Sequence, residues 1–187
     1  MKLAMVGVGQ AGGRLVDAFL EYDERAGTRV VRSALAVNTA RADLEGLERV
    51  PAPNRLLIGE SRVKGHGVGA DNELAAEIAH DDLDEVTDGL DSVPSDADAL
   101  LVAAGLGGGT GSGAAPVIVR RLKQLYSEPV YGLGVLPASD EGGLYSLNAA
   151  RSLQTLVREA DNLLVVDNDA WRDADDSVSS GFASINS

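Results

Sequence analysis

One glycine-rich segment constrains the fold of this chain more than any other feature. Residues 105–113 read GLGGGTGSG, contain six glycines, and follow closely on the apolar run Ala99–Ala103. Glycine in regular structure costs roughly 0.5–1 kcal/mol relative to alanine, so packing alone does not select six of them. A tight turn, the alternative, needs only one or two. Bare backbone amides can surround an anion, with Thr110 and Ser112 adding hydroxyl donors, so the segment predicts a phosphate-binding loop. It is not a Walker A loop, because no lysine follows.

A second glycine segment, GVGQAGG at residues 7–13, follows the first apolar run of the chain. Its spacing fits a dinucleotide-binding fingerprint, which makes an NAD-dependent oxidoreductase an alternative. Such a protein needs an acidic residue at the end of the second strand to bind the ribose. Here that strand ends in Asn38, which is neutral. The dehydrogenase interpretation is therefore disfavoured, and a second phosphate loop is the simpler prediction.

Strand-like and helix-like segments alternate along the chain. Apolar runs typical of strands lie at Leu3–Val8, Ala34–Val37, Leu56–Ile58, Ala99–Ala103, Val130–Leu136 and Leu163–Val166. Between them, apolar residues follow steps of three and four, and one helix is expected from about Ala114 to Tyr126 with Pro116 in its first turn. This order predicts an α/β fold: a doubly wound, mostly parallel six-stranded sheet with helices on both faces. Ligands of such sheets bind at the carboxyl ends of the strands.

The charge of the chain excludes several classes of partner. Among 187 residues, 16 are Lys or Arg and 29 are Asp or Glu, which gives a net charge of −13. A surface of this sign repels nucleic acids and acidic membranes, and no apolar run approaches the roughly 20 residues of a membrane span. We expect a cytoplasmic protein with no nucleic-acid partner and no direct membrane insertion. Only three basic residues are lysines, and this acidic, arginine-biased composition favours adaptation to molar salt. The lack of cysteine excludes disulfides and thiolate metal sites.

The glycine loops and their surroundings resemble the tubulin/FtsZ superfamily, and most of all CetZ, the tubulin-like group of salt-loving archaea. GGGTGSG at Gly107–Gly113 is similar to the signature loop of the superfamily. Six other segments resemble family segments in the same order: GQAGG at 9–13, AVNTARADL at 36–44, GHGVGADNELAAE at 65–77, LPASDEGGLYSLNAARSL at 136–153, VDNDAW at 166–171 and GFASIN at 181–186. The resemblance covers nearly the whole chain and implies a Rossmann-like GTPase domain.

The resemblance also implies which residues bind GTP or GDP, with Mg²⁺ carried by the nucleotide. The phosphates would be held by Gln10, Ala11, Gly12, Gly13 and Arg14, and by Gly107, Gly108, Gly109, Thr110, Gly111, Ser112 and Gly113, and Asn38 would be a further nucleotide-binding residue. Residues 67–70, with Gly69 and Ala70, would sense the γ-phosphate. Glu141 would bind the ribose, Asn168 the sugar or base, Phe182 would stack on guanine, and Asn186 would pair with its edge.

Some of these residues have simpler interpretations. A lone glutamate in a loop, such as Glu141, is usually solvated, and Phe182 would be a core residue in most helices. Asn186 lies near the end of the sequence and would contact no ligand if the helix end were frayed. His66 is either a phosphate contact or an exposed loop residue. The sequence predicts no catalytic base and no resident metal ligand.

The resemblance further implies the organisation and the role of the protein. We expect a GTP-binding domain over residues 1–176, the start of a central helix at 177–187, and an activation domain beyond Ser187. The intact family polymerises head to tail with GTP between subunits, which implies a cytoskeletal role in cell shape. The chain alone is expected to be a monomer with little GTP hydrolysis. A non-hydrolysing short form that caps filaments is the alternative.

Overall fold

The computed structural model describes residues 1–91 and 96–171. Phe182, Asn186 and the helix expected from Ser177 lie outside the described residues. The strands are β1 (Leu3–Val8), β2 (Val31–Asn38), β3 (Arg55–Leu57), β4 (Ala99–Gly105), β5 (Val130–Leu136) and β6 (Asn162–Asp167). The helices are α1 (Gly9–Ala26), α2 (Arg41–Glu45), α3 (Glu60–Val63), α4 (Asn72–Asp81), α5 (Leu83–Asp91), α6 (Gly109–Leu125) and α7 (Gly143–Glu159), with short 3-10 helices at Ala52–Asn54, Ser139–Glu141 and Asp169–Trp171.

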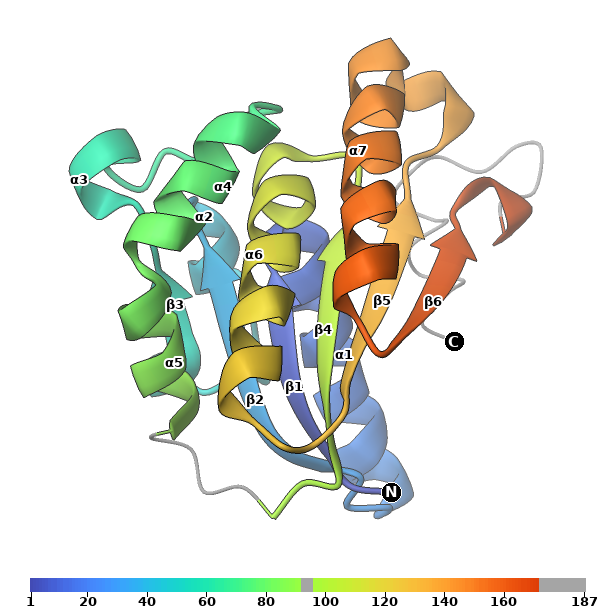
Figure 1. The fold of residues 1–187 in the computed structure, drawn as a ribbon. Helices are drawn as coiled ribbons and strands as arrows, with labels where there is room; N and C mark the ends of the chain where they lie inside the picture. Colours follow the sequence, from blue (N-terminus) through green and yellow to red (C-terminus); the bar gives the residue numbers. More distant parts are fainter. Residues whose placement is uncertain (92–95, 172–187) are drawn as a thin grey trace.

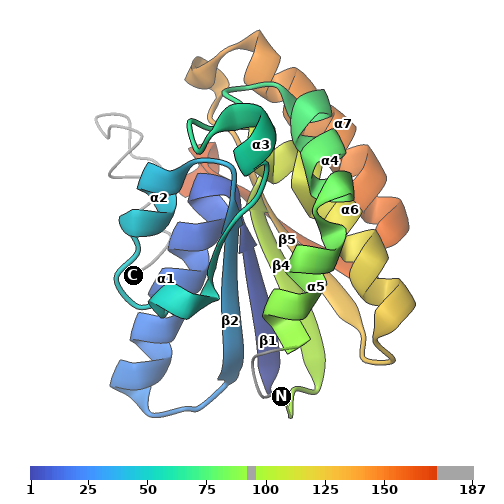
Figure 2. The same cartoon turned by 90° about the vertical axis from the view of Figure 1, so that its left-hand side faces the viewer.

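The strands form one sheet in the order β3-β2-β1-β4-β5-β6, and every neighbouring pair is parallel. β1 lies at the centre, where Val6 is paired with Leu35 on one side and Val102 on the other. Helices α4 to α7 cover one face and α1 covers the other, so the molecule has three layers (Figures 1 and 2). The predicted doubly wound α/β fold is confirmed. None of the described helices is long and apolar enough to cross a lipid bilayer.

The central strand supplies side chains to both layers of the core. Successive side chains of a strand point to opposite faces of the sheet. Met5, 1% exposed, packs with Val16 and Leu44 on the α1 side. Val6, fully buried, packs with Ile78 and Ile118 on the other side. Burial on both faces explains why β1 and β4 are continuous apolar runs rather than alternating sequences.

One predicted boundary is wrong: α6 begins at Gly109, inside the segment expected to be a loop, and not at Ala114. Pro116 therefore lies within the helix, about two turns from its start, and not in the first turn. Gly109 and Gly113 are needed for close packing, contrary to the expectation that packing does not explain the glycines of this segment. A Cβ atom at Gly109 would overlap the carbonyl oxygen of Gly69, and one at Gly113 would overlap that of Asn72. This close approach outweighs the poor helix propensity of glycine.

Candidate functional site

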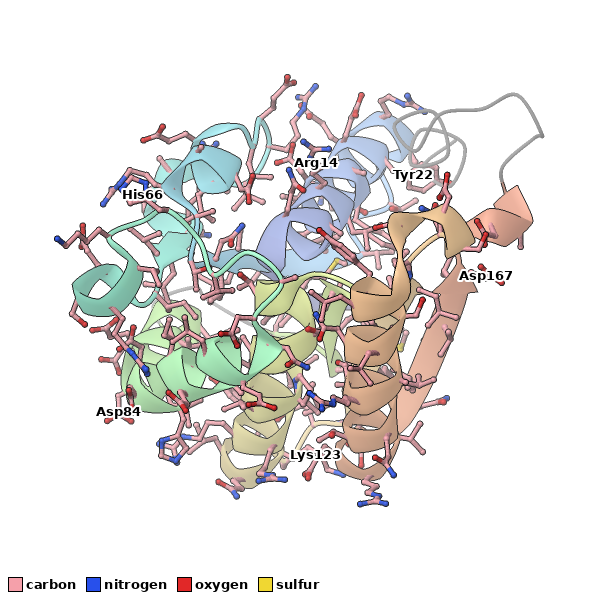
Figure 3. All side chains as sticks on the ribbon, turned by 90° about the horizontal axis from the view of Figure 1, so that it is seen from above. Arg14, Tyr22, His66, Asp84, Lys123 and Asp167 are labelled. Carbon is pink, nitrogen blue, oxygen red and sulfur yellow. The ribbon has the colours of Figure 1, made fainter. Side chains whose placement is uncertain are left out.

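A cleft with a volume of about 550 Å³ opens at the carboxyl ends of the strands. Its lining comes from the loops after β1, β2, β4, β5 and β6 and from the segment between α3 and α4. The lining residues are Val8, Gly9, Gln10, Ala11, Asn38, Ala40, Asp43, His66, Gly67, Val68, Gly69, Gly105, Gly107, Gly108, Gly109, Thr110, Gly111, Val135, Leu136, Pro137, Glu141, Tyr145 and Asn168. Seen from above (Figure 3), His66 and Asp167, the residue before Asn168, lie on opposite sides of this end of the molecule.

The two glycine segments meet at the centre of the cleft. Gly9 has a φ of +73°, a backbone conformation that favours glycine, and α1 begins at this residue. A Cβ atom at Gly9 would lie 2.8 Å from the backbone nitrogen of Gly111 in the first turn of α6. Two helix N-termini, each with backbone amides that lack partners inside the helix, therefore point at the same space. Their partial positive charge suits an anion.

Several predicted residues of the glycine segments lie outside the cleft lining. Gly12 is buried against β4, where a Cβ atom would overlap the carbonyl oxygen of Ala103. Gly13 packs near Leu47, and the close packing of Gly113 is described above. The hydroxyl of Ser112 donates to the carbonyl oxygens of Gly108 and Gly109 within the helix. These residues fix the position of the loops, whereas Gly107–Gly111 face the cleft.

The loop from residue 65 to 70 is tied to its neighbours by backbone hydrogen bonds. The amide of Arg41 donates to Gly65 O (2.9 Å), and the amide of Gly67 donates to Thr39 O (3.0 Å). The amide of Gly109 donates to Gly69 O (3.0 Å), which joins this loop to the start of α6. Gly69 lines the cleft. Ala70 is not among its lining residues.

Two hydroxyls and one amide join the loops further. Thr39 Oγ1 and Thr110 Oγ1 lie 2.8 Å apart in a buried hydrogen bond between the end of β2 and the first turn of α6. Asn148 on α7 is 2% exposed, and its Nδ2 donates to Ala70 O (2.8 Å) and Gly107 O (3.1 Å). One side chain thus holds both the 65–70 loop and the glycine loop in place.

Asn38 organises the β2 end of the cleft. Its Oδ1 accepts from the amides of Thr39 (2.8 Å) and Ala40 (3.2 Å), and its Nδ2 donates to Asp43 Oδ2 (3.1 Å). Asp43 Oδ1 accepts from Gln10 Nε2 (3.2 Å). Asn38 is 3% exposed, and these contacts occupy its side-chain oxygen and one of the two N–H groups of its amide. The predicted residues Gln10 and Asn38 are joined through a carboxylate that the sequence interpretation did not select.

Glu141 and Asn168 lie at the other end of the cleft, after β5 and β6. Glu141 Oε1 accepts from the amide of Ala138 (2.7 Å), which fixes the half-buried side chain at the rim. Asn168 is 1% exposed, and both polar atoms of its side chain lack a hydrogen-bond partner among the described residues. A buried amide without partners costs about 1–3 kcal/mol. Such an amide in the wall of a cleft is poised for a ligand with a donor and an acceptor.

The cleft has an unusual charge. Its described lining holds two carboxylates, Asp43 and Glu141, and neither lysine nor arginine. The predicted contact Arg14 is exposed on the outer part of α1 and does not line the cleft (Figure 3). The sequence leaves His66 as either a phosphate contact or an exposed loop residue. In the structure it is exposed and also lines the cleft. An anion held here would rest on backbone amides rather than on cationic side chains.

Four polar residues in or beside the cleft were not selected from the sequence: Thr39, Asp43, Tyr145 and Asn148. All four lie in the segments 36–44 and 136–153, which resemble family segments. The sequence therefore indicated these segments but not the roles of these four side chains. Asp43 occupies the helix after β2, and Asn148 the second turn of α7. Only the spatial neighbours of these side chains distinguish them from solvated polar residues.

The sheet order, the two helix N-termini and the position of the cleft define a doubly wound nucleotide-binding domain. The model of the Tubulin/FtsZ family, GTPase domain, matches residues 2–176 of the sequence. The chain belongs to the tubulin/FtsZ family.

Individual relatives agree with this assignment. The chain is 64% identical over 187 residues to the tubulin-like protein CetZ1 of Haloferax volcanii, and 35% identical over 189 residues to CetZ of Pyrococcus furiosus. These alignments cover all of this chain but 47% and 50% of those proteins, so the chain spans about half the length of the relatives that it matches.

Solved structures show the same fold. The GDP-bound monomer of CetZ1 from Haloferax volcanii superposes with a TM-score of 0.97, over all of this chain and 57% of that chain. CetZ2 from the same organism, a GTPγS-bound protofilament, gives 0.94 at 51% identity and is covered over 55% of its length. An FtsZ dimer from M. jannaschii gives 0.82 at 26% identity, over 99% of this chain and 51% of that chain.

Proposed function

We propose that this chain is the GTP- and GDP-binding domain of a CetZ-like cytoskeletal protein, with the domain over residues 1–176. The proposal rests mainly on the cleft, where the backbone amides at the centre and the side-chain amide of Asn168 at one end, which lacks a partner among the described residues, fit two parts of one ligand. The cradle suits phosphates, and the amide suits a sugar or base. The CetZ1 and CetZ2 structures named above hold GDP and GTPγS, which supports the same ligand class.

In this proposal the phosphates and the base of the nucleotide bind at different ends of the cleft. Gly107–Gly111 and the first turn of α1 hold the phosphates, and the 65–70 loop lies at the terminal phosphate. Glu141 and Asn168 hold the ribose and the near edge of the base. Phe182 and Asn186, which lie outside the described residues, complete the guanine contacts. Mg²⁺ enters with the nucleotide and neutralises phosphate charge, which suits a cleft whose described lining lacks cationic side chains.

We further propose that the intact protein polymerises head to tail and serves in the control of cell shape. The protofilament of CetZ2 supports the polymer. Hydrolysis by this chain alone is proposed to be weak, because the chain spans about half the length of the relatives that it matches and the resemblance implies that the other half completes hydrolysis. Steady GTP turnover at low protein concentration would refute that part of the proposal. Co-sedimentation with a full-length relative, without elongation, would favour a capping role instead.

The test of the ligand is a calorimetric titration of the purified protein in molar KCl with GTP, GDP, ATP and NADH. The proposal predicts that GTP and GDP bind, with ATP weaker by about tenfold or more because the base edge is read by hydrogen bonds. NADH should not bind. Equal affinity for ATP and GTP would remove the guanine assignment while leaving a nucleotide site.

A further inference from the structure

The charge of the described cleft lining does not by itself favour the nucleotide of the proposed function. A nucleoside triphosphate is polyanionic, yet the described lining of the cleft contains no lysine or arginine and includes two carboxylates. Backbone amides and helix N-termini supply only partial positive charge. A carboxylate beside phosphate oxygens opposes binding unless a cation lies between them.

The two carboxylates occupy opposite ends of the cleft. Asp43 follows β2, and Glu141 follows β5, with β1 and β4 and their glycine loops in between. Glu141 is on the same side as the side-chain amide of Asn168, and Asp43 is on the side of His66 and the 65–70 loop. Asp43 is therefore the carboxylate at the phosphate end, while Glu141 lies at the sugar end.

The hydrogen bonds that Asp43 accepts within the described residues come from neutral groups. Its two oxygens accept from Gln10 Nε2 (3.2 Å) and Asn38 Nδ2 (3.1 Å), which are both neutral amides. The side chain of Asn38 is held by hydrogen bonds from the backbone amides of Thr39 and Ala40, and it therefore holds Asp43 Oδ2 in a fixed position. Gln10 is exposed, whereas Asn38 is buried, so the oxygen that accepts from Gln10 is the one that another partner can take over.

We propose that Asp43 is the protein ligand to the divalent cation that accompanies the nucleotide, bound directly or through one of the cation's waters. The inference rests on the proposed function. Mg²⁺ in nucleotide sites is held by one or two carboxylates together with phosphate oxygens. Among the described residues, no group of three His, Cys, Asp or Glu side chains could hold a metal ion by itself. The cation therefore binds here only together with the polyphosphate.

The matched variants are Asp43→Asn, which removes the charge but keeps the shape, and Glu45→Gln, which removes the same charge from an exposed residue of the same helix. GTP affinity is measured by calorimetry with excess EDTA and with excess Mg²⁺, and Mn²⁺ binding is followed by electron paramagnetic resonance. The unchanged protein should bind Mn²⁺ only when nucleotide is present, and Mg²⁺ should strengthen its GTP binding.

In Asp43→Asn, GTP affinity in EDTA should be unchanged or higher, whereas the gain from Mg²⁺ should fall by about tenfold or more, because one full charge facing the cation is lost. Glu45→Gln should behave like the unchanged protein. The proposal is overturned if Asp43→Asn keeps the full gain from Mg²⁺, or if it loses affinity equally with and without the cation. If the unchanged protein binds no GTP in either condition, the proposed function itself has failed.

Discussion

Thr39 Oγ1 and Thr110 Oγ1 are joined by a buried hydrogen bond of 2.8 Å, which connects the end of β2 to the first turn of α6. Thr39 is fully buried, and its backbone carbonyl also accepts from the amide of Gly67. One residue thus contacts both the glycine loop and the 65–70 loop. The three loops around the cleft form one connected unit through side-chain and backbone contacts.

Thr39→Val keeps the shape of the side chain and removes its hydroxyl, which leaves the Thr110 hydroxyl without this partner. We expect a loss of about 1–2 kcal/mol in the free energy of unfolding. GTP affinity should fall as well, because the first turn of α6 is less firmly held. Chemical denaturation and calorimetry measure the two effects. Thr39→Ser, which keeps the hydroxyl, should preserve most of the affinity, and equal losses in both variants would show that packing and not the hydrogen bond matters.

Gly111 and Gly108 separate the packing role of the glycine loop from its binding role. A Cβ atom at Gly111 would overlap the carbonyl oxygen of Gly105, whereas one at Gly108 meets no atom within 4 Å. Gly111→Ala should therefore destabilise the fold by about 1–3 kcal/mol or more. Gly108→Ala should keep the stability and weaken GTP binding, because its methyl group enters the cleft. Thermal unfolding and titration of both variants test this, and equal stabilities would contradict the packing explanation.

Asn168→Leu should weaken GTP binding without lowering the stability of the fold. The Asn168 amide has no hydrogen-bond partner among the described residues, so its removal costs the protein none of their contacts. We expect the free energy of unfolding to stay the same or rise by up to about 2 kcal/mol, since an unpaired buried amide is replaced by an apolar group. GTP affinity should fall. Denaturation and calorimetry on the same sample check both, and a clear loss of stability with unchanged affinity would count against a ligand role.

The sequence predicted the sheet well because the buried central strands β1 and β4 require continuous apolar runs, and the outer strands β3 and β6 are apolar too although they are partly exposed. The start of α6 was missed because Gly109–Gly113 have poor helix propensity, and the close approach of Gly69 and Asn72 that requires glycine there is a tertiary contact. The roles of Asp43 and Asn148 depend on partners 33 and 78 residues away in the sequence, Gln10 and Ala70. No local pattern reports such pairs.

Asp161 should make the stability of the fold depend on pH. The hydrogen bond from Lys123, together with that from the amide of Val130, lowers the pKa of this carboxyl below its ordinary value. Because the pKa of Asp161 is lower in the folded protein than in the unfolded chain, the ionised carboxylate stabilises the fold at pH values above its ordinary pKa. This stabilisation is lost as the pH falls through the folded-state pKa. Asp161→Asn should cost less than about 1 kcal/mol at neutral pH, since the pair is partly exposed, and nothing at strongly acidic pH. Urea denaturation at the two pH values tests this, and a pH-independent difference would contradict it.

The most direct test of the whole account is a nuclear magnetic resonance titration of the isotopically labelled protein with Mg²⁺ and GDP. If the cleft is the nucleotide site, the largest shifts fall on the backbone amides of Gln10, Gly69 and Thr110 and on the side-chain amide of Asn168, all in one saturable step. Shifts confined to the opposite end of the sheet, around Gly27, or an Asn168 side chain that does not respond, would contradict the account.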